Sequence, residues 1–128
     1  MKRAVVALVE HEGKILLGKK RRDSEGFFAG KWHIPGETME DDETDEEALI
    51  RGMREEAGIE IRVGRYLAQH ISPKGTLVRW YECITQTYDI SNGSDLEAIA
   101  WIAKQEVPTL CETSQLWPDE IKRYFDIN

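Results

Sequence analysis

The chain of 128 residues is 41% hydrophobic and 32% charged, a composition that fits one compact domain and excludes a disordered tail or a fibre. Its formal net charge of −7 argues against binding to nucleic-acid polymers, because such binding needs a basic face to meet the phosphates. The two cysteines, Cys83 and Cys111, lie far apart and indicate free thiols in a reducing compartment. The longest apolar stretch, residues 4–9, is far shorter than the roughly 20 residues of a membrane helix, and we expect a soluble cytoplasmic protein without a membrane partner.

The N-terminal region alternates as a β-hairpin does. Apolar residues fill positions 4–9, a turn falls at 11–13, and a second strand returns through 14–17. The segment that follows is rich in basic residues, glycine and aromatic residues, which predicts a loop. We expect this loop to end in a short strand and a turn set by Pro35 and Gly36.

An acidic run leads into the best-defined predicted helix. From Glu37 to Glu47, eight of eleven residues are acidic, and an amphipathic segment follows directly. Acidic residues suit the first turn of a helix, and glycine is typical of the position after its last turn. The pattern therefore predicts a helix over 45–57 that ends at Gly58.

The rest of the chain alternates between strands and short helices. Strands are predicted at 59–68, 77–88 and 98–103, and a short helix or turn at 107–110. Pro118 is expected at the first position of a last helix that runs through Tyr124, because proline is tolerated there. No internal repeat or linker is evident, so residues 1–128 are predicted to form one α/β or α+β domain with a mixed sheet.

Two adjacent carboxylates close the predicted acidic helix. Glu55 and Glu56 are about 100° apart around the helix axis, so both can approach one point beside it. Carboxylate oxygens are the ligands that Mg²⁺ prefers, together with water and substrate phosphates. The alternative from helix position alone is that both acids are merely solvated on a helix face.

The segment from Glu37 to Ile59 resembles the Nudix box. In that family the pattern is Gly, five residues, Glu, seven residues, Arg-Glu, an aliphatic residue, any residue, Glu-Glu, any residue, Gly and an aliphatic residue. At this spacing the chain carries Glu43, Arg51, Met53, Glu55, Glu56, Gly58 and Ile59. The hairpin before the box and the region around Trp101 also look like parts of a Nudix domain.

The resemblance implies an α/β/α sandwich with a central mixed β-sheet. It also implies a pyrophosphohydrolase that acts on a nucleoside triphosphate or another nucleoside diphosphate derivative with Mg²⁺ or Mn²⁺. By this likeness Glu55 and Glu56 hold the metal, Arg51 orients a neighbouring glutamate, and Glu43 helps to fix the loop. Such chemistry needs mainly positioning and charge stabilisation, which carboxylate-bound metal can supply.

The chain departs from the family pattern at two positions. Glu37 stands where the box has its first glycine, and Gly52 stands where the box has the glutamate after arginine. Glycine inside a helix costs on the order of 1 kcal/mol relative to alanine. Three explanations of Gly52 stay open: close packing against a neighbour, replacement by another carboxylate such as Glu97 or Glu47, or a domain that binds nucleotides with weak or no catalysis.

Several residues before the box are candidates for substrate binding. Arg21 and Arg22 could reach phosphates, because guanidinium groups match phosphate oxygens. Aromatic rings near the box, Phe27, Phe28 and Trp32, could stack on a base, although such rings more often pack in a core. Gly36 completes the predicted substrate-binding set of Arg21, Phe28, Trp32 and Gly36. The predicted catalytic set is Glu55, Glu56, Arg51 and Glu97, with Glu55, Glu56 and Glu97 as metal ligands; homodimer formation is left open.

Overall fold

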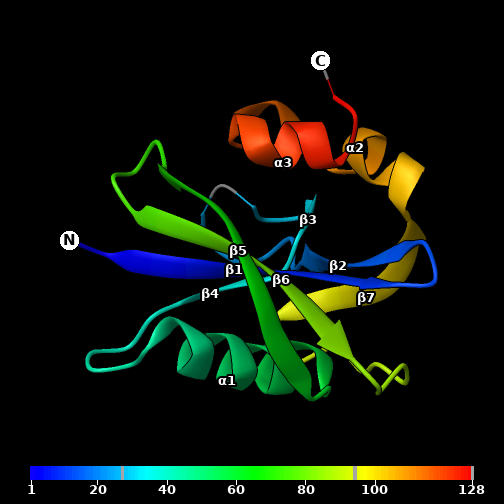
Figure 1. The fold of residues 1–128 in the computed structure, drawn as a ribbon, viewed down its shortest axis with the longest axis horizontal. Helices are drawn as coiled ribbons and strands as arrows, with labels where there is room; N and C mark the ends of the chain where they lie inside the picture. Colours follow the sequence, from blue (N-terminus) through cyan, green and yellow to red (C-terminus); the bar gives the residue numbers. More distant parts are fainter. Residues whose placement is uncertain (27, 94, 128) are drawn as a thin grey trace.

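A computed structural model describes residues 1–26, 28–93 and 95–127, and within them seven strands form one mixed sheet between helices (Figure 1). The strands are β1 (Arg3–His11), β2 (Lys14–Lys20), β3 (Trp32–His33), β4 (Gly36–Thr38), β5 (Ile61–Ile71), β6 (Leu77–Thr85) and β7 (Leu96–Ala103). The helices are α1 (Asp45–Ala57), α2 (Val107–Leu110) and α3 (Asp119–Tyr124), with 3-10 turns at Lys104–Glu106 and Ser114–Leu116. Helix α1 lies on one side of the sheet and α2 and α3 lie on the other, which confirms the predicted α/β/α architecture.

The sheet is mixed because one central pair of strands is parallel. Strand β1 runs parallel to β6, while β2 and β4 pair with β1 in the antiparallel sense. The main path is β3-β2-β1-β6-β5, with β7 added to β2. This order brings β4 beside β1, so the chain enters α1 from a position next to the middle of the sheet.

Helix α1 is bounded by strong local signals. The Thr44 hydroxyl accepts a hydrogen bond from the Glu47 backbone N–H, and the Glu47 carboxylate accepts one from the Thr44 N–H, which makes a capping box. At the other end Gly58 has φ of 67°, a left-handed conformation that favours glycine. The predicted helix over 45–57 is confirmed.

Two layers of apolar side chains cover the two faces of the sheet. On β1, Val5 and Val9 face α1, while Leu8 faces the opposite side. Leu49 and Met53 of α1 are almost fully buried in the first layer. The second layer is closed by residues from the C-terminal region: Val107, Trp117, Ile121 and Phe125. The first layer fixes α1 against the sheet and holds its C-terminal end in one place.

The structure corrects two local expectations. Strand β4 begins at Gly36, where the sequence predicts a turn, because this segment pairs with β1. A Cβ atom on Gly36 would lie 2.9 Å from the Val5 carbonyl oxygen, so glycine is needed for close approach of the backbones. Pro118 is the N-cap of α3 and not its first helical residue.

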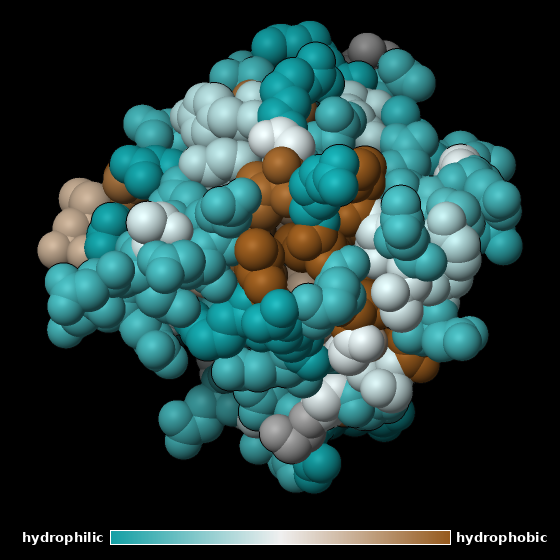
Figure 2. All heavy atoms as spheres, turned by 60° about the horizontal axis from the view of Figure 1, so that its bottom comes forward, coloured by the Kyte–Doolittle hydropathy of each residue, from teal (hydrophilic) through white to brown (hydrophobic). Residues whose placement is uncertain are grey.

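The face that α1 occupies is mainly hydrophilic, with an apolar patch near its centre (Figure 2). This surface agrees with the acidic sequence of the helix and of the loop before it. Among the described residues, no helix has the length and apolar character needed to cross a membrane.

Candidate active site

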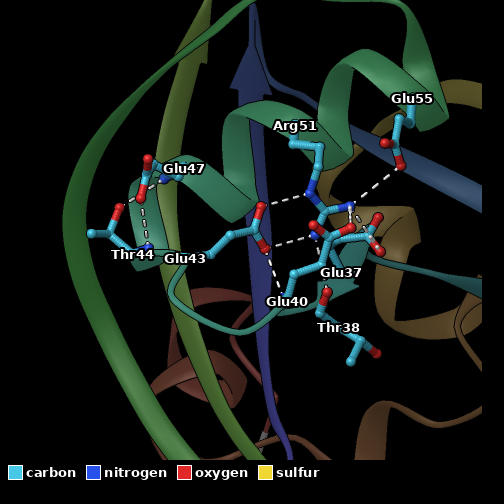
Figure 3. A network of polar contacts seen from close by, with 8 residues as sticks. All are labelled: Glu37, Thr38, Glu40, Glu43, Thr44, Glu47, Arg51 and Glu55. Carbon is cyan, nitrogen blue, oxygen red and sulfur yellow. Dashed lines mark hydrogen bonds and ion pairs between the residues drawn. The ribbon is translucent and has the colours of Figure 1, made fainter.

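Arg51 is the centre of a polar network that fixes the loop before α1 to the helix (Figure 3). Its Nε donates to Glu43 Oε2 at 2.6 Å and its Nη2 donates to Glu43 Oε1 at 2.9 Å, a two-pronged pair. The same Nη2 donates to the Thr38 carbonyl oxygen at 3.1 Å. The network therefore ties the end of β4 and the acidic loop to the middle of α1.

The other amino group of Arg51 faces several carboxylates at once. Nη1 lies 3.4 Å from Glu55 Oε2, 3.6 Å from Glu37 Oε1 and 3.9 Å from Glu40 Oε1. One guanidinium thus forms ion pairs with four carboxylates, including that of Glu43. The cluster keeps an excess of negative charge near the C-terminal half of α1.

The paired charges of Arg51 and Glu43 shift both pKa values. Hydrogen bonds from Arg51 lower the pKa of Glu43 to about 2, and the same bonds raise the pKa of the guanidinium. The Glu43 side chain is only 14% exposed, so the pair is shielded from much of the solvent. This geometry agrees with the proposed role of Glu43 in fixing the loop.

The Glu43 interaction predicts a pH-dependent contribution to stability. The pKa of Glu43 is lower in the folded protein than its ordinary 4.5. Ionised Glu43 therefore contributes to folding stability above about pH 4.5, and this contribution is lost as the pH falls toward 2. We expect Glu43→Gln to lower the melting temperature by a few degrees at pH 7. Thermal melts of both proteins between pH 2 and 7 should converge in acid, and an equal difference at every pH would contradict this.

A pocket of about 270 Å³ lies beside the C-terminal end of α1. Its lining residues are Glu37, Glu55, Glu56, Gly93, Asp95 and Leu96. The loop before β7 reaches the helix end through its backbone, because the Gly93 N–H donates to the Glu56 carbonyl oxygen at 3.0 Å. A Cβ on Gly93 would lie 2.1 Å from the Glu55 carbonyl oxygen, so only glycine allows this approach.

Glu56 is the most perturbed carboxylate of the pocket. Burial, reinforced by the charge of Glu37 and opposed by that of Lys20, raises the pKa of Glu56 to about 8. Its Oε2 atom is buried and has no hydrogen-bond partner. A buried carboxylate oxygen without a partner is costly, so this atom is suited to meet a ligand.

Gly52 and Glu37 are packed against each other. A Cβ atom on Gly52 would lie 2.9 Å from Glu37 Cβ and 3.2 Å from both Cγ and Oε2 of Glu37. The side chain of Glu37 therefore fills the space into which a side chain at position 52 would extend. Close packing explains why glycine is present here, and the neighbour is a carboxylate.

The donor set fits a hard divalent cation. The pocket offers only oxygen ligands from side chains, and Glu56 Oε2 lacks a partner. Among the described residues, no three His, Cys, Asp or Glu side chains are already gathered as a metal cage. Mg²⁺ does not require one, because it is usually bound through one or two carboxylates, several waters and substrate phosphates.

The structure brings only some of the predicted carboxylates to the pocket. Glu55 and Glu56 line the pocket together, but Glu97 is not among the lining residues. Its carboxylate instead lies 3.7 Å from Lys19 Nζ and 3.5 Å from Arg22 Nε. Glu47 is engaged in the helix cap. Neither of the two acids considered as replacements for the missing glutamate is brought to this pocket.

The predicted substrate contacts have different surroundings. Arg21 is paired with the Asp23 carboxylate at 2.9 Å, and Trp32 packs against the core layer on the α3 side. Phe28 is 40% exposed, and its ring lies 5.2 Å from the ring of His33. Gly36 is explained by the close approach of β4 to β1, which leaves no room for a Cβ atom. Phe27 lies outside the described residues.

Three residues near the pocket were missed by reasoning from the sequence. Glu37 and Asp95 line it, and the charge of Lys20 acts on Glu56. A signal for Glu37 was available, because the two departures from the box exchange the same residue types: glutamate replaces glycine at 37 and glycine replaces glutamate at 52. No comparable local signal marks Asp95, which the fold brings from a distant loop.

The fold is a mixed sheet between helices, and an acidic pocket lies at the C-terminal end of α1. Nearly the whole chain, residues 1–125, matches the model of the NUDIX domain. The chain therefore belongs to the Nudix family, and the predicted class of Nudix pyrophosphohydrolase is confirmed. Hydrolases of this family generally use divalent metal ions.

Curated relatives and solved structures agree with this family. The CTP pyrophosphohydrolase of Escherichia coli (strain K12) is 46% identical over 66 residues, which cover 52% of this chain and about half, 47%, of that protein. The nucleoside triphosphatase NudI of Enterobacter sp. (strain 638) is 29% identical over 120 residues, 83% of this chain and 84% of that one. A NUDIX hydrolase structure from Nitrosomonas europaea has a TM-score of 0.81 at 24% identity, covering 98% of this chain and 70% of its own, and supports the fold.

Proposed function

We propose that this chain uses Mg²⁺, or Mn²⁺, to hydrolyse the pyrophosphate linkage of a nucleoside triphosphate or another nucleoside diphosphate derivative. The observation that supports this most is the buried Glu56 Oε2, which has no partner in a pocket lined by several carboxylates. A divalent cation bound there would satisfy this atom and attract a polyphosphate. The names of the CTP pyrophosphohydrolase and of NudI favour the same substrate class.

In this proposal Glu55 and Glu56 hold the metal at the end of α1. When bound, the cation would supply charge stabilisation for the phosphate oxygens and a more acidic water. Arg51 positions Glu55 and holds the loop through Glu43. The neighbouring cation Lys20, together with Arg21, would contact outlying phosphates, and the exposed ring of Phe28 would contact the base.

A substrate panel tests the proposed reaction. Ribonucleoside and deoxyribonucleoside triphosphates and nucleoside diphosphate derivatives would be incubated with Mg²⁺ or with EDTA, and the products separated by ion-exchange chromatography. We expect at least one compound to be cleaved at its pyrophosphate linkage only when Mg²⁺ is present. Nucleotide binding by calorimetry without metal-dependent cleavage of any compound would contradict the proposal and favour a binding domain. Light scattering on the same sample would test homodimer formation.

A further inference from the structure

We propose that Glu37 supplies the third carboxylate of the metal site, in place of the side chain that is absent at Gly52. This inference rests on the proposed function and deepens it, because it assigns to the site a residue from β4 that lies outside the usual helical glutamates. It also explains both departures of this chain from the family pattern as one exchange. One of the two positions, 37 or 52, would then supply a carboxylate, and glycine at the other position would leave room for it.

Helix geometry shows where a side chain at position 52 would go. Gly52 precedes Glu56 by four residues, so the two positions lie on the same face of α1, one turn apart. A side chain at 52 would extend toward the region next to Glu56. Glu37 already occupies that region, since its Cβ, Cγ and Oε2 lie 2.9, 3.2 and 3.2 Å from a Cβ built on Gly52.

The strand pairing holds Glu37 in this position. In the ladder between β1 and β4, Glu37 is opposite Val5, a fully buried residue that packs toward α1. Side chains at paired positions of a sheet share a face. The Glu37 side chain is therefore directed toward α1 by the backbone, and it lines the pocket together with Glu55 and Glu56.

The negative charge of Glu37 is only partly compensated by its neighbours. Its side chain is 23% exposed, and its recorded ion pair is with Arg51 Nη1 at 3.6 Å. That guanidinium is already engaged by Glu43 through its Nε and Nη2. A half-buried carboxylate that shares one arginine with three other acids is only partly compensated by it. A divalent cation between Glu37 and Glu56 would compensate both.

The test uses Mn²⁺ binding without nucleotide, followed by electron paramagnetic resonance, on the full chain. Glu37→Gln should weaken Mn²⁺ binding about tenfold or more, and the double exchange Glu37→Gly with Gly52→Glu should recover most of the affinity and of the Mg²⁺-dependent hydrolysis. Glu46→Gln, an equal charge change at an exposed position of α1, serves as the matched control and should stay within about twofold of the wild type.

Two results would overturn the inference. Unchanged Mn²⁺ affinity in Glu37→Gln, or a loss no larger than in Glu46→Gln, would show that Glu37 is not a ligand while leaving the proposed function intact. A double exchange that keeps the wild-type circular dichroism spectrum and melting temperature but does not recover Mn²⁺ affinity would show that the two positions are not equivalent. If the wild-type chain bound no Mn²⁺ and cleaved no nucleotide, the proposed function itself would fail.

Discussion

Replacing Glu56 by Gln is expected to lower Mg²⁺-dependent kcat/KM by about 10²- to 10³-fold while leaving the fold intact. The amide has nearly the same size as the carboxyl group, but it carries no charge and is a weak ligand for Mg²⁺. The buried Oε2 of Glu56 has no protein partner that the change would break. Steady-state hydrolysis of the best substrate of the panel would measure the loss.

Thermal melts provide the control for this variant. In EDTA at pH 7, Glu56→Gln should melt close to the wild-type temperature, because a buried carboxyl whose pKa is raised to about 8 is already largely uncharged there. Added Mg²⁺ with nucleotide should raise the melting temperature of the wild type, since a ligand that binds only the folded state stabilises it. The variant should lose this shift. Full activity in Glu56→Gln would exclude Glu56 as a metal ligand.

The single change Gly52→Glu is expected to destabilise the protein by about 1–3 kcal/mol, as overpacking in a filled space does. Restoring the family residue at position 52 is therefore expected to cost folding stability as long as Glu37 is present. The new Cβ would lie 2.9 Å from Glu37 Cβ, which belongs to a strand and cannot move as the end of a flexible side chain can. Chemical denaturation of both proteins would measure the difference.

A double-mutant cycle identifies Glu37 as the cause. Gly52→Ala adds only the Cβ atom, and in the Glu37→Gly background the three atoms nearest to it, all from the Glu37 side chain, are absent. There, alanine should stabilise the helix by about 1 kcal/mol, its ordinary advantage over glycine. In the wild-type background this gain should be reduced or reversed by the contact. Equal effects in both backgrounds would show that Glu37 does not restrict position 52.

Local sequence signals predicted the framework of this fold well. The acidic first turn and Gly58 predict α1 at the bounds that the structure shows, because such signals act within a few residues of the helix ends. Strand β4 was missed because it depends on pairing with β1, about thirty residues away in the chain. Its length of three residues is also too short to show an alternating pattern.

The candidate site shows the same division between local and distant information. The positions of Glu55 and Glu56 follow from the helix that carries them. The family resemblance suggests Glu97 as a replacement acid and helix spacing suggests Glu47, but each has other partners in the fold. The position of Glu37 opposite Gly52 depends on how β4 packs on α1, which no local pattern records. Two reciprocal departures from one motif were the available clue.

The most direct measurement is a crystal structure of the full chain soaked in Mn²⁺, with anomalous differences recorded to locate the ion. We expect a peak beside the C-terminal end of α1, within bonding distance, about 2.0–2.6 Å, of oxygens from Glu56 and Glu55 or Glu37. An ion bound elsewhere, with no peak near these carboxylates, would contradict the account of this pocket as a metal-dependent site.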